Sequence, residues 1–158
     1  MSSSDEAAQE IYEYSRRGKV TEVEKLLDSI HPDTYVAYDG STACLMACKN
    51  GHRTICELLV NNGADLSRRK DDGSSSLFLS ACSGDSDLVR FVLNHRSGDI
   101  NECNEDGFTP LDIAAHYNHI EIVELLRSHG GVSSGLLTPE VGEVNAGPGE
   151  KWGYGVFD

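Results

Sequence analysis

The chain has 158 residues, of which 39% are hydrophobic and 25% are charged, and its formal net charge is −13 at pH 7. This length suits one domain whose core needs no disulfide or metal for stability. The strong negative charge argues against binding to nucleic acid or to an anionic membrane surface, and it favours a basic protein partner.

The first six residues, MSSSDE, have neither the basic start nor the apolar core of a secretory signal. No stretch of the sequence is apolar enough to predict a membrane-spanning helix. The five cysteines lack the spacing of a disulfide framework. These features predict a reducing compartment, so we expect a cytoplasmic location, with the nucleus as a second location.

Three sets of landmarks recur along the chain with one period. Asp-Gly pairs stand at 39–40, 72–73 and 106–107, which are 33 and 34 residues apart. A second set consists of a glycine or asparagine at positions 18, 51, 84 and 118. A third set consists of paired aliphatic residues at 26–27, 59–60, 92–93 and 125–126. One period shared by several landmarks indicates stacked structural repeats.

In chain order, the period predicts a cap, three repeats and a tail. Residues 6–37 form a half-repeat whose polar outer face closes the N-terminal end. Each full repeat reads as an Asp-Gly turn, a short helix with small residues on one face, a break, and a second helix with apolar residues at helical spacing. The full repeats cover 38–70, 71–104 and 105–131, so the repeat domain covers 1–131.

The last segment, residues 132–158, has many glycines, two of the four prolines and no period, so we predict an extended tail. Its end reads KWGYGVFD and contains the only tryptophan. Trp152, Tyr154 and Phe157 together bury enough apolar area to order a short strand. We therefore expect this end to dock on the repeats or on a partner.

The third repeat carries a sequence that resembles a known family. Residues 107–115 read GFTPLDIAA, which is similar to the GxTPLHxAA motif of the ankyrin repeat, and residues 61–66, NNGADL, are similar to its turn. The resemblance implies an all-α ankyrin-repeat solenoid of helix-turn-helix pairs with β-hairpin loops. Leu45, Phe78 and Asp112 replace the family's histidine, so we expect softer contacts between repeats.

Four residues suggest a metal site at first sight. Cys44, Cys48, His52 and Cys56 are each four residues apart, which on one helix would form a zinc-binding stripe. Gly51 separates the two helices, however, and the cysteines fall at core positions, where cysteine packs as a small hydrophobe. We therefore expect buried, reduced thiols with no metal and no cofactor.

No catalytic motif is recognisable, so we expect the protein not to be an enzyme. None of the six histidines stands beside a candidate nucleophile in a motif, and there is no glycine-rich phosphate loop. The run Arg68, Arg69 and Lys70 is followed by Asp71 and Asp72. We interpret this run as a solvated hairpin rather than a nucleic-acid site.

The ankyrin resemblance implies that partners bind to the hairpin tips and to the exposed face of the first helices. The residues at those positions, together with the aromatic end of the tail, are Arg16, Arg17, Val36, Tyr38, Ser41, Lys49, Asn50, Arg69, Asp71, Ser74, Cys82, Ser83, Cys103, Glu105, Phe108, His116, Tyr117, Trp152, Tyr154 and Phe157. We expect Tyr38, Phe108 and Tyr117 on one accessible concave face, because aromatic residues often dominate binding energy. The alternative is packing within the chain, of Phe108 against the last hairpin and of Tyr117 against the tail.

Two functional hypotheses follow from the sequence. The first is a monomeric protein–protein interaction module that acts as an adaptor, scaffold or inhibitor. The alternative is an acidic escort for a basic client protein, whose affinity would fall steeply with ionic strength. In addition, Leu93 and the sequence Asp99-Ile100-Asn101 are similar to the ankyrin sequence that asparaginyl hydroxylases recognise, so Asn101 is a candidate modification site, with a structural turn as the alternative.

Overall fold

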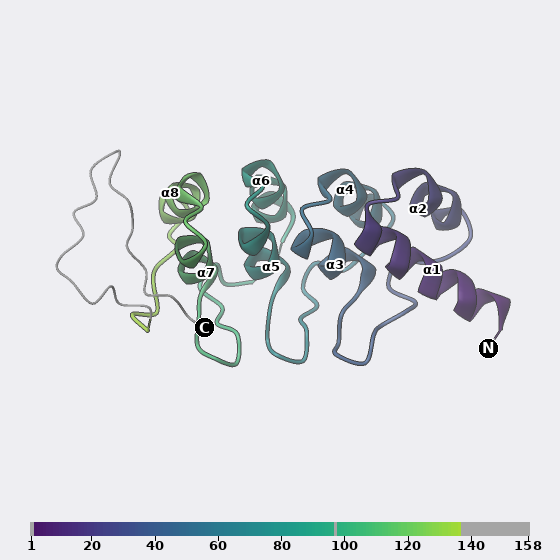
Figure 1. The fold of residues 1–158 in the computed structure, drawn as a ribbon, viewed down its shortest axis with the longest axis horizontal. Coiled ribbons are helices and arrows are strands. Elements are labelled where there is room, and N and C mark those ends of the chain that lie inside the picture. The colour runs from purple at the N-terminus through teal and green to yellow at the C-terminus, as the bar shows by residue number, and fades with distance from the viewer. Residues whose placement is uncertain (1, 97, 137–158) are drawn as a thin grey trace.

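The computed structural model describes residues 2–96 and 98–136 of the chain, and within them it is all helical apart from two isolated β-bridges. The helices of the described residues are α1 (Ser3–Arg17), α2 (Val20–Leu27), α3 (Ala43–Lys49), α4 (Arg53–Asn61), α5 (Ser76–Ser83), α6 (Ser86–His95), α7 (Pro110–His116) and α8 (Ile120–Ser128). Figure 1 shows them stacked side by side as antiparallel pairs, with long loops on one side. This arrangement confirms the predicted solenoid.

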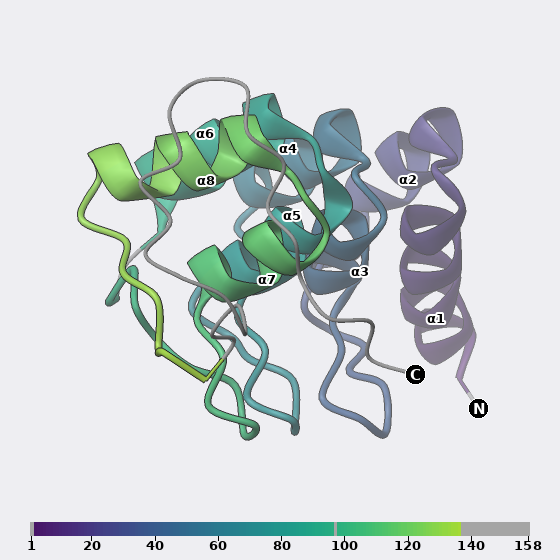
Figure 2. The same ribbon diagram turned by 60° about the vertical axis from the view of Figure 1, so that its left-hand side comes forward.

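The helix pairs form two rows. Figure 2 shows an inner row of α1, α3, α5 and α7 next to the hairpin loops, and an outer row of α2, α4, α6 and α8 farther from them. Large side chains between the rows are fully buried, and they include Ile11, Val23, Leu45, Ile55, Leu59, Leu88, Val89, Val92, Ile122, Val123 and Leu126. One core therefore continues along the array, as expected for repeats that cannot bury their apolar faces singly.

Hydroxyl caps determine where the inner helices begin. The side chains of Thr42, Ser75 and Thr109 each accept a hydrogen bond from the backbone amide three residues later. Such caps satisfy amides that have no partner within the helix. Helix α1 begins at Ser3, three residues before the expected start of the cap, because Ser2 and Asp5 form a capping box there.

The hairpins repeat the same backbone pattern and are joined to one another. The bridges pair Val36 with Thr42 and Arg69 with Ser75, in the first two hairpins. The Asp71 amide donates to the Asp39 carbonyl oxygen at 2.9 Å, and the Glu105 amide donates to the Asp72 carbonyl oxygen at 2.8 Å. The three hairpins therefore form one connected edge along the solenoid.

Two histidines at the starts of outer helices link neighbouring repeats. Nε2 of His52 lies 3.2 Å from the Arg16 carbonyl oxygen, and Nε2 of His119 lies 3.2 Å from the Cys82 carbonyl oxygen. In the second repeat Asp85 holds this position, and its carboxylate accepts a hydrogen bond from the Leu88 amide of its own helix. Within the described residues, the junction between the first and second repeats therefore has no histidine link.

The first residues of the predicted tail are bound to the third repeat. The Thr109 hydroxyl donates to the Val132 carbonyl oxygen at 2.9 Å, and the Ser133 hydroxyl donates to Asp112 at 2.6 Å. The Ser134 amide also donates to the Asp112 carboxylate. Residues 132–136 thus extend the packed structure beyond the predicted domain end at residue 131. The predicted aromatic end, with Trp152, Tyr154 and Phe157, lies outside the described residues.

Candidate functional site

The structure leaves most of the predicted contact residues accessible. The exposed ones are Arg16, Arg17, Val36, Tyr38, Lys49, Asn50, Arg69, Asp71, Cys103, Glu105 and Tyr117. The half-buried ones are Cys82, Ser83, Phe108 and His116. These residues come from α1, from the three hairpins and from the ends of the inner helices, so a partner that touched them would lie along the length of the solenoid.

Two predicted contact residues, Ser41 and Ser74, are buried, so this part of the prediction was wrong. The Ser41 amide donates to Oδ1 of Asp39 at 3.1 Å, and the Ser74 amide donates to Oδ1 of Asp72 at 2.9 Å. These turns direct the chain inward at once, toward the start of the next inner helix. The sequence carried a signal for this, because an aspartate whose side chain accepts a hydrogen bond from the backbone amide two residues later is typical of such turns.

Tyr38 is the most accessible aromatic residue of the first hairpin, with a relative exposure of 100%. It lines an open depression of about 270 Å³ together with Asp39, Lys70, Asp71 and Asp72. The depression therefore lies between the first two hairpin tips, and it offers an aromatic ring next to carboxylates.

The other two aromatic residues of the predicted face differ from Tyr38. Phe108 is half-buried and packs against the core, so it does pack within the chain, although the alternative had placed it against the last hairpin. Tyr117 remains 54% exposed at the end of α7, although its ring stacks on His119 at a centroid distance of 6.0 Å. Tyr38 and Tyr117 are therefore the accessible aromatic groups, and a shared concave face for all three stays a prediction.

The basic run of the second hairpin makes contacts within the protein. Nε and one terminal nitrogen of Arg69 donate to the Gly73 carbonyl oxygen at 2.8 and 2.6 Å, and that same nitrogen donates to the Cys103 carbonyl oxygen at 2.5 Å. Nζ of Lys70 lies 3.3 Å from Asp39 and 3.7 Å from Asp72. The run therefore joins neighbouring hairpins, and interpreting it as a merely solvated hairpin was incomplete.

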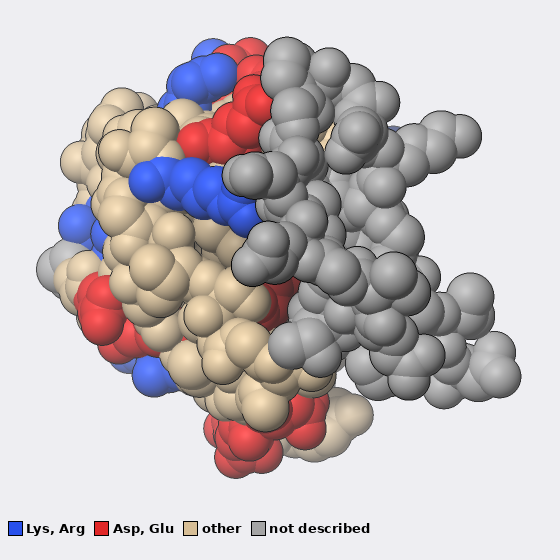
Figure 3. Space-filling view, turned by 90° about the vertical axis from the view of Figure 1, so that its left-hand side faces the viewer, with Lys and Arg blue, Asp and Glu red and all other residues tan. Residues whose placement is uncertain are grey.

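The hairpin tips keep a negative charge. Asp71, Glu105 and Asp106 are exposed, and no cation pairs with them in the part of the chain that the structure describes. Figure 3 shows acidic side chains gathered at the lower end of the molecule, where the hairpins lie. Burial by itself raises the pKa of Asp39, but hydrogen bonds from Ser41 and Lys70 outweigh it and hold that pKa below its ordinary value.

Asn101 has a structural role in the turn after α6. Its side-chain amide donates to the Gly130 carbonyl oxygen at 3.1 Å, and its Oδ1 accepts a hydrogen bond from the Val132 amide at 2.8 Å. The side chain thereby ties this turn to the segment after α8. These contacts agree with the alternative of a structural turn, and hydroxylation of Asn101 stays a prediction.

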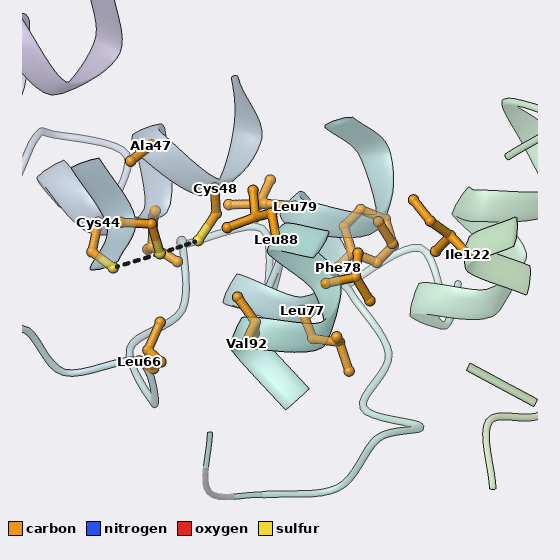
Figure 4. Packing of buried hydrophobic residues seen from close by; sticks show 14 of the residues in the cluster. Cys44, Ala47, Cys48, Leu66, Leu77, Phe78, Leu79, Leu88, Val92 and Ile122 are labelled. Carbon is orange, nitrogen blue, oxygen red and sulfur yellow. Dashed lines mark hydrogen bonds between the residues drawn. The ribbon is translucent and has the colours of Figure 1, made fainter. Parts of the chain in front are cut away.

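The helices of the first full repeat bring three thiols together, which we call the thiol cluster: Cys44, Cys48 and Cys56. All three are buried, as predicted. Sγ of Cys56 lies 3.5 Å from Sγ of Cys48 and 3.9 Å from Sγ of Cys44 (Figure 4). Sequence reasoning set the stripe aside because Gly51 breaks the helix, but that same break folds α4 back along α3. His52 is not part of the cluster, since it contacts Arg16.

None of the described helices combines the length and the apolarity needed to cross a bilayer. Two family models match the chain: "Ankyrin repeats (3 copies)" over residues 62–134 and "Ankyrin repeat" over residues 39–71. The matched residues coincide with the three repeats and hairpins described above.

Curated proteins with similar sequences cover a wide range of sources. The chain is 34% identical over 90 residues to alpha-latrocrustotoxin-Lt1a of Latrodectus tredecimguttatus, and the aligned region covers 57% of the chain and 6% of the toxin. It is 35% identical over 95 residues to putative ankyrin repeat protein FPV031 of Fowlpox virus (strain NVSL), and the aligned region covers 57% of the chain and 28% of the viral protein. It is 31% identical over 98 residues to potassium channel AKT1 of Arabidopsis thaliana, and the aligned region covers 61% of the chain and 11% of the channel. The chain thus spans less than a third of each of these proteins.

Proposed function

Because the chain belongs to the ankyrin-repeat family, it is a protein–protein interaction module, and we propose that it binds a basic segment of a partner protein through its hairpin tips. The observation that carries this proposal is Tyr38, which is fully exposed beside the carboxylates of Asp39, Asp71 and Asp72. Tyrosine is one of the residue types that most often dominate binding energy at protein interfaces.

The chemistry of the tips favours lysine or arginine on the partner. A cationic side chain above the Tyr38 ring gains a cation–π interaction, and the flanking carboxylates supply charge-assisted hydrogen bonds. Lys70 already neutralises part of the charge of Asp39 and Asp72, whereas Asp71, Glu105 and Asp106 keep theirs. The overall charge of −13 adds long-range attraction, which raises the rate of association with a basic partner.

We propose further that the protein acts without catalysis, as a monomeric adaptor, scaffold or inhibitor in the cytoplasm or the nucleus. An acidic escort for a basic client is the second candidate, and the negative hairpin edge favours it. The dependence of affinity on salt concentration distinguishes the two functions. An escort held mainly by charge loses affinity steeply as ionic strength rises, whereas an adaptor anchored by Tyr38 and Tyr117 retains much of its affinity.

The test is selection of random peptides displayed on phage against the full chain. We expect enrichment of lysine and arginine among the selected peptides. Tyr38→Ala should weaken binding of a selected peptide by about 1–2 kcal/mol, which is roughly 5- to 30-fold. Asp71→Asn should weaken binding and reduce its salt dependence.

The matched control is Glu124→Gln, which removes one exposed carboxylate from the outer helix α8. This variant should bind the selected peptide as the wild type does. Selection of neutral or acidic peptides, or equal affinity of the Tyr38→Ala variant, would overturn the proposal.

A further inference from the structure

The thiol cluster has the dimensions of a metal site. Its sulfur atoms all lie within 4.8 Å of one another, and two of the separations are 3.5 and 3.9 Å. Three atoms with these separations lie on a circle of radius about 2.2–2.4 Å, which matches a metal–thiolate bond of about 2.3 Å. An ion at the centre would therefore bond equally to Cys44, Cys48 and Cys56 with little movement of the sulfurs.

The number of donors selects the kind of ion. Among the described residues, the group that could hold a metal consists of these three thiols and includes no histidine or carboxylate. Zinc requires four ligands, whereas a soft monovalent ion such as Cu(I) is satisfied by three sulfurs and prefers thiolates. We propose that the thiol cluster binds one Cu(I) ion in trigonal coordination. This proposal replaces the expectation from sequence that the three thiols carry no metal.

The charges at the site fit a monovalent ion. An ion of charge +1 that displaces one thiol proton forms a complex with no net charge. Its binding therefore buries no net charge, which a core would resist.

The bonds and protons balance without a change of oxidation state. Three Cu–S bonds replace the two S···S hydrogen-bond contacts, and one S–H bond breaks, with its proton passing to the buffer. Copper stays Cu(I) and sulfur stays at the thiol level. Any further proton that leaves Cys44 or Cys48 goes to the buffer, and the complex then gains one negative charge.

The surroundings of the cluster shield a bound ion. Figure 4 shows the Cys44 and Cys48 side chains among buried hydrophobic residues, and Ala47 and Leu66 belong to the same buried cluster. All three cysteines are at most 1% exposed, so water and oxygen are excluded. Entry of the ion requires a local opening of the structure around the cluster, which makes binding slow. A bound ion stabilises the closed state and raises the melting temperature.

The test is an anaerobic competition between the reduced full chain and the chromophoric chelator bicinchoninate, which holds Cu(I). We expect the protein to remove one equivalent of Cu(I), and X-ray absorption to report three sulfur ligands. The Cys82→Ser/Cys103→Ser double variant should behave as the wild type, because these two thiols lie outside the cluster. Cys48→Ala and Cys56→Val keep apolar side chains in the core and should weaken binding at least about 100-fold.

Circular dichroism of the variants separates loss of the site from loss of the fold. A folded Cys56→Val chain that binds Cu(I) as tightly as the wild type would overturn the proposal. Failure of the wild type to remove Cu(I) from the chelator would do the same. Preferential binding of Zn²⁺ with four ligands would overturn the assignment of Cu(I).

Discussion

The hydroxyl of Ser133 donates a hydrogen bond of 2.6 Å to Oδ1 of Asp112, and this contact joins the segment after α8 to the buried start of α7. The Asp112 carboxylate also accepts hydrogen bonds from the Thr109 and Ser134 amides. Asp112→Ala should therefore lower the free energy of unfolding by about 2–3 kcal/mol, since buried donors lose their partner. Urea denaturation measures this loss. Asp106→Ala, at an exposed hairpin tip, is the control and should change stability by less than about 0.5 kcal/mol.

Acid should destabilise the protein through the same carboxylate. Burial by itself raises the pKa of Asp112, but hydrogen bonds from Ser133, Ser134 and Thr109 outweigh it and hold that pKa below its ordinary value of 3.8. The folded state therefore binds this proton less readily than the unfolded state does. The stabilisation is fully present above the ordinary value and is lost as pH falls through the lowered one.

Melting temperatures recorded from about pH 6 to about pH 2 test this expectation. The wild type should lose more stability over this range than the Asp112→Asn variant, whose amide does not titrate. Parallel curves for the two proteins would contradict a role for Asp112.

The neighbouring residues Arg68 and Arg69 of the second hairpin should differ in how much they contribute to the stability of the fold. Arg69 donates to the Gly73 and Cys103 carbonyl oxygens, whereas Arg68, whose side chain is exposed, makes one long ion pair of 3.8 Å with the buried carboxylate of Asp33. Arg69→Ala should cost about 1.5–3 kcal/mol of stability, as expected for hydrogen bonds from a charged group. Arg68→Ala should cost less than about 1 kcal/mol. Equal losses in chemical denaturation would show that Arg69 does not hold the hairpins together.

Replacing Phe108 should lower the stability of the fold, whereas replacing Tyr38 should affect binding alone. Because Phe108 packs against the core, Phe108→Ala should cost about 2 kcal/mol, roughly half the loss for a fully buried phenylalanine. Tyr38→Ala should leave the melting temperature unchanged, because the side chain is fully exposed. Calorimetry of both variants provides the measurement, and a destabilised Tyr38→Ala chain would argue for an internal contact.

Native thiol labelling should proceed in stages. Cys103 is exposed and should react first with an aromatic disulfide reagent. Cys82 is half-buried, and burial raises its pKa to about 11, so little thiolate is present and reaction is slow. The thiol cluster should react last and slowly, through local opening or unfolding, because its sulfurs are inaccessible in the closed fold. Prompt reaction of more than two thiols in the folded protein would contradict this order.

The sequence was sufficient to predict the solenoid, because the period repeats at three independent landmarks and each landmark has a local cause. Thr42, Ser75 and Thr109 start helices through their own side chains, so neighbouring residues determine those positions. The burial of Cys44, Cys48 and Cys56 followed from the same register. These features depend on contacts within one repeat or on its regular recurrence.

The features that the sequence did not predict depend on how elements meet in space. The Cys56 sulfur approaches Cys44 and Cys48 only because α4 folds back along α3. The attachment of residues 132–136 depends on a carboxylate about twenty residues away in the chain, which no local pattern marks. The burial of Ser41 and Ser74 depends on the direction in which the hairpin leaves its turn.

Within residues 2–96 and 98–136, the first and second repeats lack the histidine link of the other junctions, and this has a consequence for cooperativity. The stability of a linear repeat array is the sum of repeat and interface contributions, so the weakest interface determines where the array separates. The outer helices α4 and α6 also approach each other less closely than α2 and α4 or α6 and α8, whereas the inner helices α3 and α5 pack as closely as the other inner pairs, so the weak part of this junction is its outer row. Residues on either side of this boundary should therefore exchange their amide hydrogens as two distinct units. The thiol cluster lies in the repeat that borders this boundary, so transient separation of the two units is the natural route by which solvent, and any ion it carries, reaches the sulfurs.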